Sequence, residues 1–300
     1  MRSQSDIYVP HRHTKQPIKL VLQYALLAIV AFLMAFPFLW MVLTTFKTSG
    51  NIFRLPPSLI PDKLFGEDPF GNYRLLFSDY NFLRYALNTF VVATLAALGQ
   101  IITCSLAAFA FARLTFKGSR VIFGLLLATL VLPIEVTIVP EYLIALLVYE
   151  PALQAIGLRW IDSLAPLIVP SFFVGATGTF LLREFFSTIP RDLEEAAVID
   201  GASVFAIYRR IFLPLATPAL ITLFLLAFIT NWNDLLRAVL YIKSPNLRTL
   251  PIGLALFQDE YATQWDLLLA GSVVTILPLI IVYIFMQKYI VEGIATTGIK

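Results

Sequence analysis

Six long apolar segments constrain the fold of this chain more than any other feature. They occupy residues 20–46, 85–112, 121–148, 164–182, 215–236 and 267–287. A helix needs about 20 apolar residues to cross roughly 30 Å of hydrocarbon, whereas a barrel strand needs about ten residues of alternating polarity. All six segments have 19 residues or more, and they lack that alternation. With 59% hydrophobic and 14% charged residues, the chain is predicted to be an all-α membrane protein with six transmembrane helices.

The distribution of lysine and arginine predicts the orientation of these helices. With the amino end inside, the inner loops and tails hold 13 of the 22 basic residues. Basic loops are retained on the cytoplasmic side, so both termini are expected to face the cytoplasm. The expected organisation is a cytoplasmic amino tail (1–19), a transmembrane domain (20–288) and a cytoplasmic carboxy tail (289–300).

Several kinds of site are missing from the sequence. The single cysteine, Cys104, lies within the second apolar segment, and His11 and His13 lie in the polar amino tail without further metal ligands. No G-x-x-x-x-G-K-[ST] phosphate cradle occurs. We therefore expect no catalytic residue, metal site or bound cofactor in this chain, and any nucleotide energy has to come from a partner. The net charge of +3 is what basic inner loops produce, and it does not indicate nucleic-acid binding.

A charged stretch of residues 183–214, which we call the insert, separates the fourth and fifth apolar segments. Its core reads EEAAVIDGASVFAIYRRIFLP from Glu194 to Pro214. Pro190 followed by three acids predicts the amino end of a helix, because the helix dipole favours negative charge there. Gly201 is expected to end this helix and Ser203 to cap a second one, which Pro214 is expected to stop.

The same stretch resembles the E-A-A...G...I-x-L-P signature of ABC importer permeases. Glu195-Ala196-Ala197, Gly201 and Ile211-x-Leu213-Pro214 match it at the family's spacing. In that family the segment is a cytoplasmic coupling helix, between helices 4 and 5, that docks on an ATPase. The resemblance implies a set of ATPase-coupling residues: Glu194, Glu195, Ala196, Ala197, Asp200, Gly201, Ala202, Ile211 and Pro214.

Most of the chain resembles the carbohydrate permeases of this family. The resemblance implies a non-catalytic, multi-pass subunit of a prokaryotic inner membrane that imports a sugar or sugar-like solute by alternating access. It also implies a heterodimer with a homologous permease, two ABC ATPase subunits that bind ATP and Mg, and an extracytoplasmic solute-binding protein. The 237–266 loop is then expected to reach the binding protein, and residues 289–300 to run along the ATPases. Two features depart from the family pattern: Glu141, and Leu236-Arg237-Ala238 where a proline is common.

Polar residues within the predicted helices are candidates for the substrate path, because ionisable groups in hydrocarbon tend to line cavities. Glu135 and the group Asn231, Trp232, Asn233 and Asp234 offer hydroxyl partners and a stacking face for a carbohydrate. Alternatively, Glu135 satisfies backbone groups freed by nearby prolines, and Trp232 is an interfacial anchor.

An alternative function is a self-contained ion-coupled carrier or channel. Glu135, Glu141 and Asp234 would be its relay groups.

Overall fold

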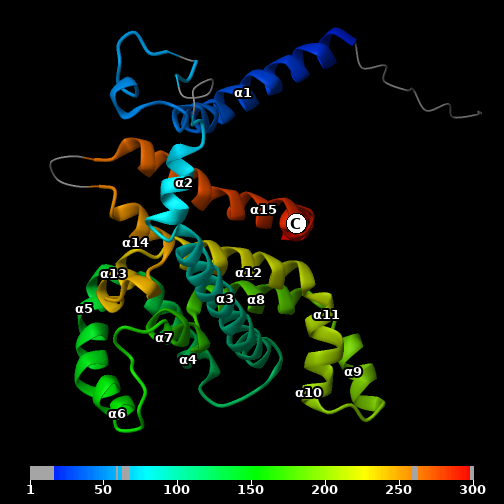
Figure 1. The fold of residues 1–300 in the computed structure, drawn as a ribbon. Helices are drawn as coiled ribbons and strands as arrows, with labels where there is room; N and C mark the ends of the chain where they lie inside the picture. Colours follow the sequence, from blue (N-terminus) through cyan, green and yellow to red (C-terminus); the bar gives the residue numbers. More distant parts are fainter. Residues whose placement is uncertain (1–16, 59, 63–67, 259–262, 298–300) are drawn as a thin grey trace, which may run out of the picture. The chain divides into compact units, whose positions relative to one another are not determined.

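The computed structural model describes residues 17–58, 60–62, 68–258 and 263–297, and no strand occurs in these ranges (Figure 1). They are mostly helical, as the sequence predicts. The chain divides into two compact units, residues 1–69 and 70–300, which are described separately. His11 and His13 lie outside the described residues.

The first unit consists of one long helix and the loop that follows it. Helix α1 (Pro17–Thr44) covers the first predicted span, and η1 (Ser49–Asn51) is a single 3₁₀ turn. The Lys47 ammonium lies 4.4 Å from the centre of the Trp40 ring and donates to the Ser58 carbonyl at 2.7 Å. The loop therefore folds back onto the carboxyl end of its own helix.

The second unit is organised around α3 (Phe82–Arg113). This helix packs against α8 (Ala176–Thr188) and α12 (Thr217–Trp232), and α12 packs in turn against α15 (Trp265–Thr297). Small residues line the buried surface of α3: Ala93, Ala96, Ala97, Cys104 and Ala108 are all fully buried. Because lipid is as apolar as leucine, membrane helices gain most from close packing, which small residues allow.

Two aromatic clusters lie at the two ends of α3. At its amino end, Phe82 stacks on Phe257 and packs with Tyr85, close to α2 (Gly71–Ser78) and α14 (Leu250–Ala255). At its carboxyl end, Phe109 packs edge-on against Phe186 of α8 and Phe212 of the insert. The insert is therefore part of the packed core of this unit.

The third apolar segment, predicted as one helix over 121–148, is broken, so that prediction is wrong. The structure has α4 (Ser119–Ala128) and η2 (Thr129–Val131), then α5 (Ile134–Ile144), a π-helical turn η3 (Ala145–Tyr149) and α6 (Glu150–Gln154). The break falls at Leu132-Pro133, where both residues are extended. Proline lacks an N–H and forces the preceding residue out of the helical region.

The fourth and fifth segments also differ from single straight helices. The fourth begins with α7 (Ala165–Ile168) and the 3₁₀ turn η4 (Val169–Phe172) before α8. In the fifth, α12 has 16 residues and lies at 77° to the helical stretch Val204–Leu215. In the described residues, five helices are long and apolar enough to cross a membrane, or six if this bent pair is one span. The count of six thus stays a prediction.

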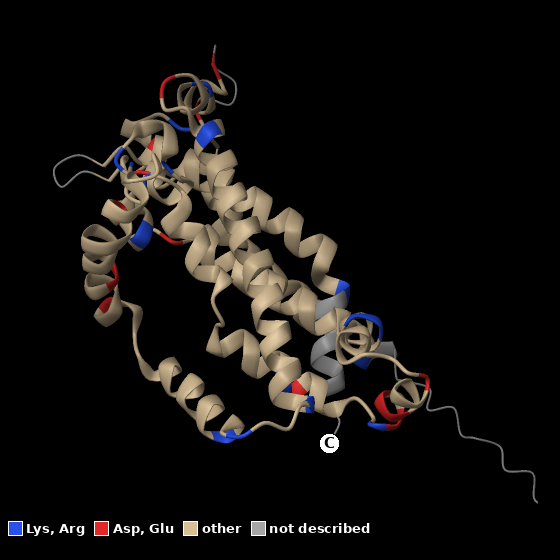
Figure 2. Cartoon of the chain, turned by 90° about the horizontal axis from the view of Figure 1, so that it is seen from below, with Lys and Arg blue, Asp and Glu red and all other residues tan. Residues whose placement is uncertain are grey.

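Two short elements, α13 (Leu236–Tyr241) and η6 (Pro245–Leu247), follow α12. The last helix, α15, continues past residue 288, where the membrane boundary was expected, to Thr297. The charged residues lie mostly near helix ends and in loops, while long stretches of the helices carry none (Figure 2). This pattern fits helices whose middle parts are surrounded by hydrocarbon.

Gly178 of α8 tests the close packing around α3. A Cβ at this position would lie 2.9 Å from the Cys104 sulfur and 3.0 Å from Leu223 Cδ1. Gly178→Ala should therefore destabilise the purified protein by about 1–3 kcal/mol, since overpacking displaces neighbours. The measurement is thermal unfolding in detergent.

Gly124→Ala is the matched control. Gly124 lies in α4 with nothing within 4 Å of an added Cβ, so alanine should be neutral or stabilising there by its helix propensity. Equal effects of the two substitutions would contradict the packing described for α3.

Candidate functional site

The first arm of the insert is α9 (Asp192–Ile199), which carries Asp192, Glu194 and Glu195 in its first turn as predicted. Gly201 follows it with φ of +79°, a left-handed conformation that glycine adopts without strain. The Ala202 amide donates to the Ala197 carbonyl at 2.9 Å, and the Gly201 amide to the Val198 carbonyl at 3.0 Å. This pair of backbone hydrogen bonds is a Schellman cap. It confirms that Gly201 ends the helix.

The second arm consists of α10 (Val204–Ile207), a π-helical turn η5 (Tyr208–Phe212) and α11 (Leu213–Leu215). Ser203 Oγ accepts from the Ala206 amide at 3.3 Å, so Ser203 caps this arm as predicted. The second arm ends at Leu215, one residue after Pro214, and a bend of 77° separates it from α12, so the predicted stop at Pro214 is confirmed to within one residue. The wider π turn just before Pro214 accommodates a residue that cannot donate a backbone hydrogen bond.

The two arms expose a set of large apolar side chains. Ile199 is 85% exposed, Phe205 62% and Val198 58%. Ala196, which follows Glu195, is also exposed. Ala197, Ala202 and Ile211 instead pack against the core behind the insert. An exposed apolar patch rimmed by polar residues is typical of a protein contact surface.

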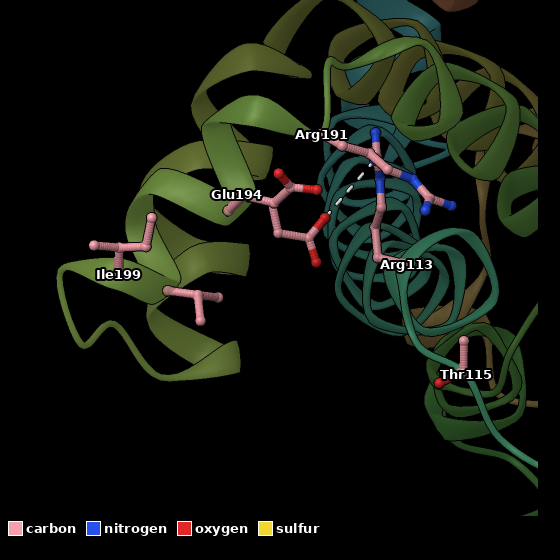
Figure 3. A pocket seen from close by; sticks show the side chains of 7 residues that line it. Arg113, Thr115, Arg191, Glu194 and Ile199 are labelled. Carbon is pink, nitrogen blue, oxygen red and sulfur yellow. Dashed lines mark ion pairs between the residues drawn. The ribbon is translucent and has the colours of Figure 1, made fainter.

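Arg113, the last residue of α3, connects the insert to the helices behind it (Figure 3). Its guanidinium lies 3.7 Å from the Glu194 carboxylate and 4.9 Å from the centre of the Phe212 ring. It also donates to the Phe186 and Ile189 carbonyls at the carboxyl end of α8. The side chain is only 4% exposed.

A cavity of about 420 Å³ lies beside this contact (Figure 3). Its lining residues are Arg113, Thr115, Arg191, Glu194, Glu195, Val198 and Ile199. Both basic and acidic groups therefore border it, together with the apolar side chains at the end of α9.

A second buried contact anchors the insert. Tyr208 in η5 shares a 2.7 Å hydrogen bond with Ser105 of α3, and both side chains are buried. Neither Arg113 nor Ser105 was among the coupling residues predicted from the sequence. Both residues are far from the insert in the sequence, and their contacts with it form only when the helices pack. No sequence pattern therefore predicted these contacts.

The predicted substrate-path residues fall in two places. Asn231 and Trp232 are the last two residues of α12, and Asn233 and Asp234 follow it. Trp232 is 1% exposed and stacks on Phe228, so its ring presents no free face in this conformation. Glu135 lies in the first turn of α5 with an exposed side chain, where the helix dipole favours a carboxylate. α5 does not pack closely against α12, and the substrate role of these five residues stays a prediction.

The two departures from the family pattern meet each other. Arg237 of α13 lies 3.4 Å from the Glu141 carboxylate of α5 and 3.8 Å from the Asp234 carboxylate. Asp234 also accepts from the Arg237 amide at 3.1 Å. Glu141 and Asp234 together offset the charge of Arg237, which explains how an acid and a base are both tolerated at these positions. The structure thus brings Glu141, rather than Glu135, to Asp234.

Asp162 organises the loop after α13, which the family resemblance assigns to the binding protein. Its carboxylate accepts from the amides of Lys243 and Ser244 at 3.0 and 2.7 Å and from the Ser244 hydroxyl at 2.6 Å. These hydrogen bonds from Ser244 and Lys243 hold the pKa of Asp162 below its ordinary value of 3.8. Residues 259–262 of the loop lie outside the described residues.

No group of three His, Cys, Asp or Glu side chains suited to a metal ion occurs in the described part of the chain. Cys104 is buried and its sulfur lies 3.4 Å from the Gly175 carbonyl.

Comparisons with known proteins point to one family. Residues 100–296 match the family described as "Binding-protein-dependent transport system inner membrane component". The probable ABC transporter permease protein YurM of Bacillus subtilis is 35% identical over 271 residues, which are 89% of this chain and 84% of that protein. The arabinooligosaccharides transport system permease protein AraQ of Bacillus subtilis is 31% identical, covering 96% of this chain and 99% of that protein. The sn-glycerol-3-phosphate transport system permease protein UgpE of Brucella abortus is 33% identical, covering 94% and 98%.

A solved structure has a similar fold. A chain of a bacterial ABC transporter involved in the import of the acidic polysaccharide alginate superposes with a TM-score of 0.70 at 23% identity. The match covers 94% of this chain and 100% of that chain. At this identity the likeness shows the fold alone.

Asp162→Asn tests the ordering of the loop after α13. Asparagine tolerates the left-handed backbone of Asp162, whose φ is +58°, so the substitution removes mainly the charge. Losing charge-assisted hydrogen bonds should speed tryptic cleavage after Lys243 about fivefold at neutral pH. Asp79→Asn at the end of α2 is the control and should leave this cleavage unchanged.

The stability of the loop after α13 should depend on pH in a defined direction. The pKa of Asp162 is depressed in the folded chain. Its contribution to the stability of this loop is therefore fully present above the ordinary pKa of 3.8, and it is lost as the pH falls through the lower folded pKa. Hydrogen exchange of residues 243–244 in the native chain should therefore show reduced protection only below about pH 4, and Asp162→Asn should abolish that step. A step of equal size in Asp162→Asn would contradict the role of this carboxylate.

Proposed function

Because the chain belongs to the family of binding-protein-dependent transport system inner membrane components, we propose that it is the permease subunit of an ATP-driven ABC importer for a sugar or sugar-like solute. The exposed apolar face of the insert carries the proposal. Ile199 at the end of α9 is 85% exposed and Phe205 of the next arm is 62% exposed, so covering these side chains is favourable. The insert is predicted to lie in the cytoplasm, where an ATPase is available.

The insert is built to transmit force from such a partner. Its outer face is exposed, while Tyr208 and Phe212 on its inner face are buried against α3 and α8. A displacement of α9 by an ATPase therefore acts on packed helices rather than on a free loop. The ATPase subunits bind ATP and Mg in this scheme, and the present chain catalyses no covalent step.

The sugar assignment rests on the relatives and on the polar groups at the end of α12. One relative is an arabinooligosaccharides permease, and another, of Agrobacterium fabrum, is a sulfoquinovosyl glycerol permease at 33% identity. Asn231, Asn233 and Asp234 supply hydrogen-bonding groups for sugar hydroxyls, with Glu135 as a further candidate. A rotation of α12 that freed the Trp232 ring would add a stacking face.

The partner permease is expected to cover the region from α4 to α6. Only 11% of the apolar stretch of Ile134–Gln154 is buried, against 39% for Phe82–Arg113. Together with the π turn in η3 and the exposed carboxylate of Glu135, this argues for a protein neighbour, since a charge facing lipid is costly. A homologous permease in a heterodimer would supply it.

The ion-coupled carrier is less well supported by the geometry. Two of its three relay groups, Glu141 and Asp234, form ion pairs with Arg237. Their carboxylates are therefore already engaged by a side chain of the same protein and are less available to a transported ion.

Co-purification from the native membrane in mild detergent tests the assembly. We expect a second multi-span permease and an ABC ATPase to accompany this chain, and ATP-dependent uptake when the complex and its binding protein are reconstituted. A chain that purifies alone and moves solute in liposomes without ATP would contradict the proposal.

Gly201→Val tests the insert itself. Nothing lies within 4 Å of an added Cβ, so only the positive φ opposes the change. For a β-branched residue this costs about 1–2 kcal/mol, which should misplace α9 and lower uptake per ATP about tenfold while the chain stays in the membrane. Gly201→Asn is the matched control, because asparagine tolerates this conformation, and it should retain uptake. Full coupling in Gly201→Val would count against the coupling role.

Glu195→Lys tests the exposed acid of α9. Glu195 is exposed, so its charge reversal should leave the fold intact and weaken ATPase binding in pull-down by about 1 kcal/mol or more. Glu195→Gln should have a smaller effect, and equal ATPase recovery in all three chains would oppose an interface at Glu195.

A further inference from the structure

Arg113 joins four elements through one side chain. It belongs to α3, donates to two carbonyls at the end of α8, pairs with Glu194 of α9 and lies over the Phe212 ring of η5. Among the described residues, no other ion pair links the insert to α3. The guanidinium suits this role because it has five donors in a rigid planar fork.

The surroundings of Arg113 make these contacts strong and directional. The side chain is 4% exposed, and little water competes for its hydrogen bonds. The guanidinium lies over the Phe212 ring, which packs with Phe109 and Phe186 in a cluster whose ring centres are 5.0 to 6.4 Å apart. The positive charge also meets the negative end of the α8 dipole. The guanidinium is therefore held from several sides and cannot swing freely with solvent.

The two adjacent acids of α9 differ in their surroundings. Glu194 pairs with Arg113 and is 24% exposed, whereas Glu195 also borders the cavity but is exposed and forms no ion pair with Arg113. The Glu194 side chain borders the 420 Å³ cavity on the Arg113 side (Figure 3). One acid thus ties α9 to its own chain, and the next stays available to a partner.

We propose that Arg113 is the positioning residue that transmits movement between α9 and α3, by locking the first turn of α9 to the ends of α3 and α8. This inference rests on the proposed function of the insert. A push on α9 passes through Glu194 to Arg113 and so to the helix at the centre of the second unit. Without the guanidinium, α9 is attached mainly by apolar contacts, which are less directional.

Arg113→Gln is the primary test, with Arg183→Gln as the matched control. Arg183 also forms an ion pair, with Glu184 at 2.6 Å, and lies 4.4 Å from the centre of the Phe123 ring. It does not bond to α9, so the control repeats the chemistry without the connection. Arg113→Lys keeps the charge but loses the planar fork.

The first readout is hydrogen exchange of α9 in the purified chain. Arg113→Gln should speed exchange of the amides at 195–199 about tenfold, Arg113→Lys should do so less, and Arg183→Gln should leave them unchanged. Unchanged exchange in Arg113→Gln would overturn the inference, whatever the fate of the proposed function.

The second readout is uptake per ATP hydrolysed in the reconstituted complex. Arg113→Gln should lower this ratio about tenfold while ATP hydrolysis and subunit recovery stay near normal, and Arg113→Lys should restore part of it. A parallel fall in uptake, hydrolysis and recovery would indicate a merely structural residue and overturn the inference. Absence of ATP-driven uptake in the unaltered complex would instead overturn the proposed function, and the exchange measurement would still decide the positioning role.

Discussion

The second unit depends on the close approach of helices around α3. In a bilayer the hydrophobic effect does not drive helices together, so contact area and close packing have to do so. Fully buried alanines along α3 and Gly178 on α8 allow that approach. Larger residues fill the two ends of the helix, where Phe82 and Phe109 lie in separate aromatic clusters. Small side chains therefore pack along the middle of α3, and aromatic side chains pack at its two ends.

Charge and backbone irregularity are placed in accordance with this packing. Arg113 ends α3 and Arg237 lies in α13, and each is held by carboxylates or carbonyls. Prolines break the third and fourth apolar segments where a straight helix was expected, at Pro133 and near Pro170. Free backbone groups near a membrane need partners. The least buried part of the unit, from α4 to α6, contains the break at Pro133 and the π turn η3, which is consistent with a neighbouring protein subunit.

Much of the insert was predictable because its signals are local. Acids in the first turn of α9, the left-handed Gly201 and the Ser203 cap all act within a few residues of the chain. The π turn η5 just before Pro214 was not predictable, because it depends on Tyr208 and Phe212 being buried against other helices. The same limit applies to Glu141 and Arg237, which are 96 residues apart. Each looked like an isolated departure from the family pattern until the structure placed them together.

Composition, the length of the apolar runs and short-range helix signals establish three properties: the chain is a helical membrane protein, a charged insert divides its later spans, and the insert carries a permease signature. None of these properties requires knowledge of the packing. The packing of the helices sets where the spans break, which acid of α9 pairs with Arg113 and which residues hold the insert in place. These outcomes depend on contacts between residues far apart in the chain. The Arg113–Glu194 pair forms because α3, α8 and the insert meet at one point, and no local pattern in the sequence encodes that meeting.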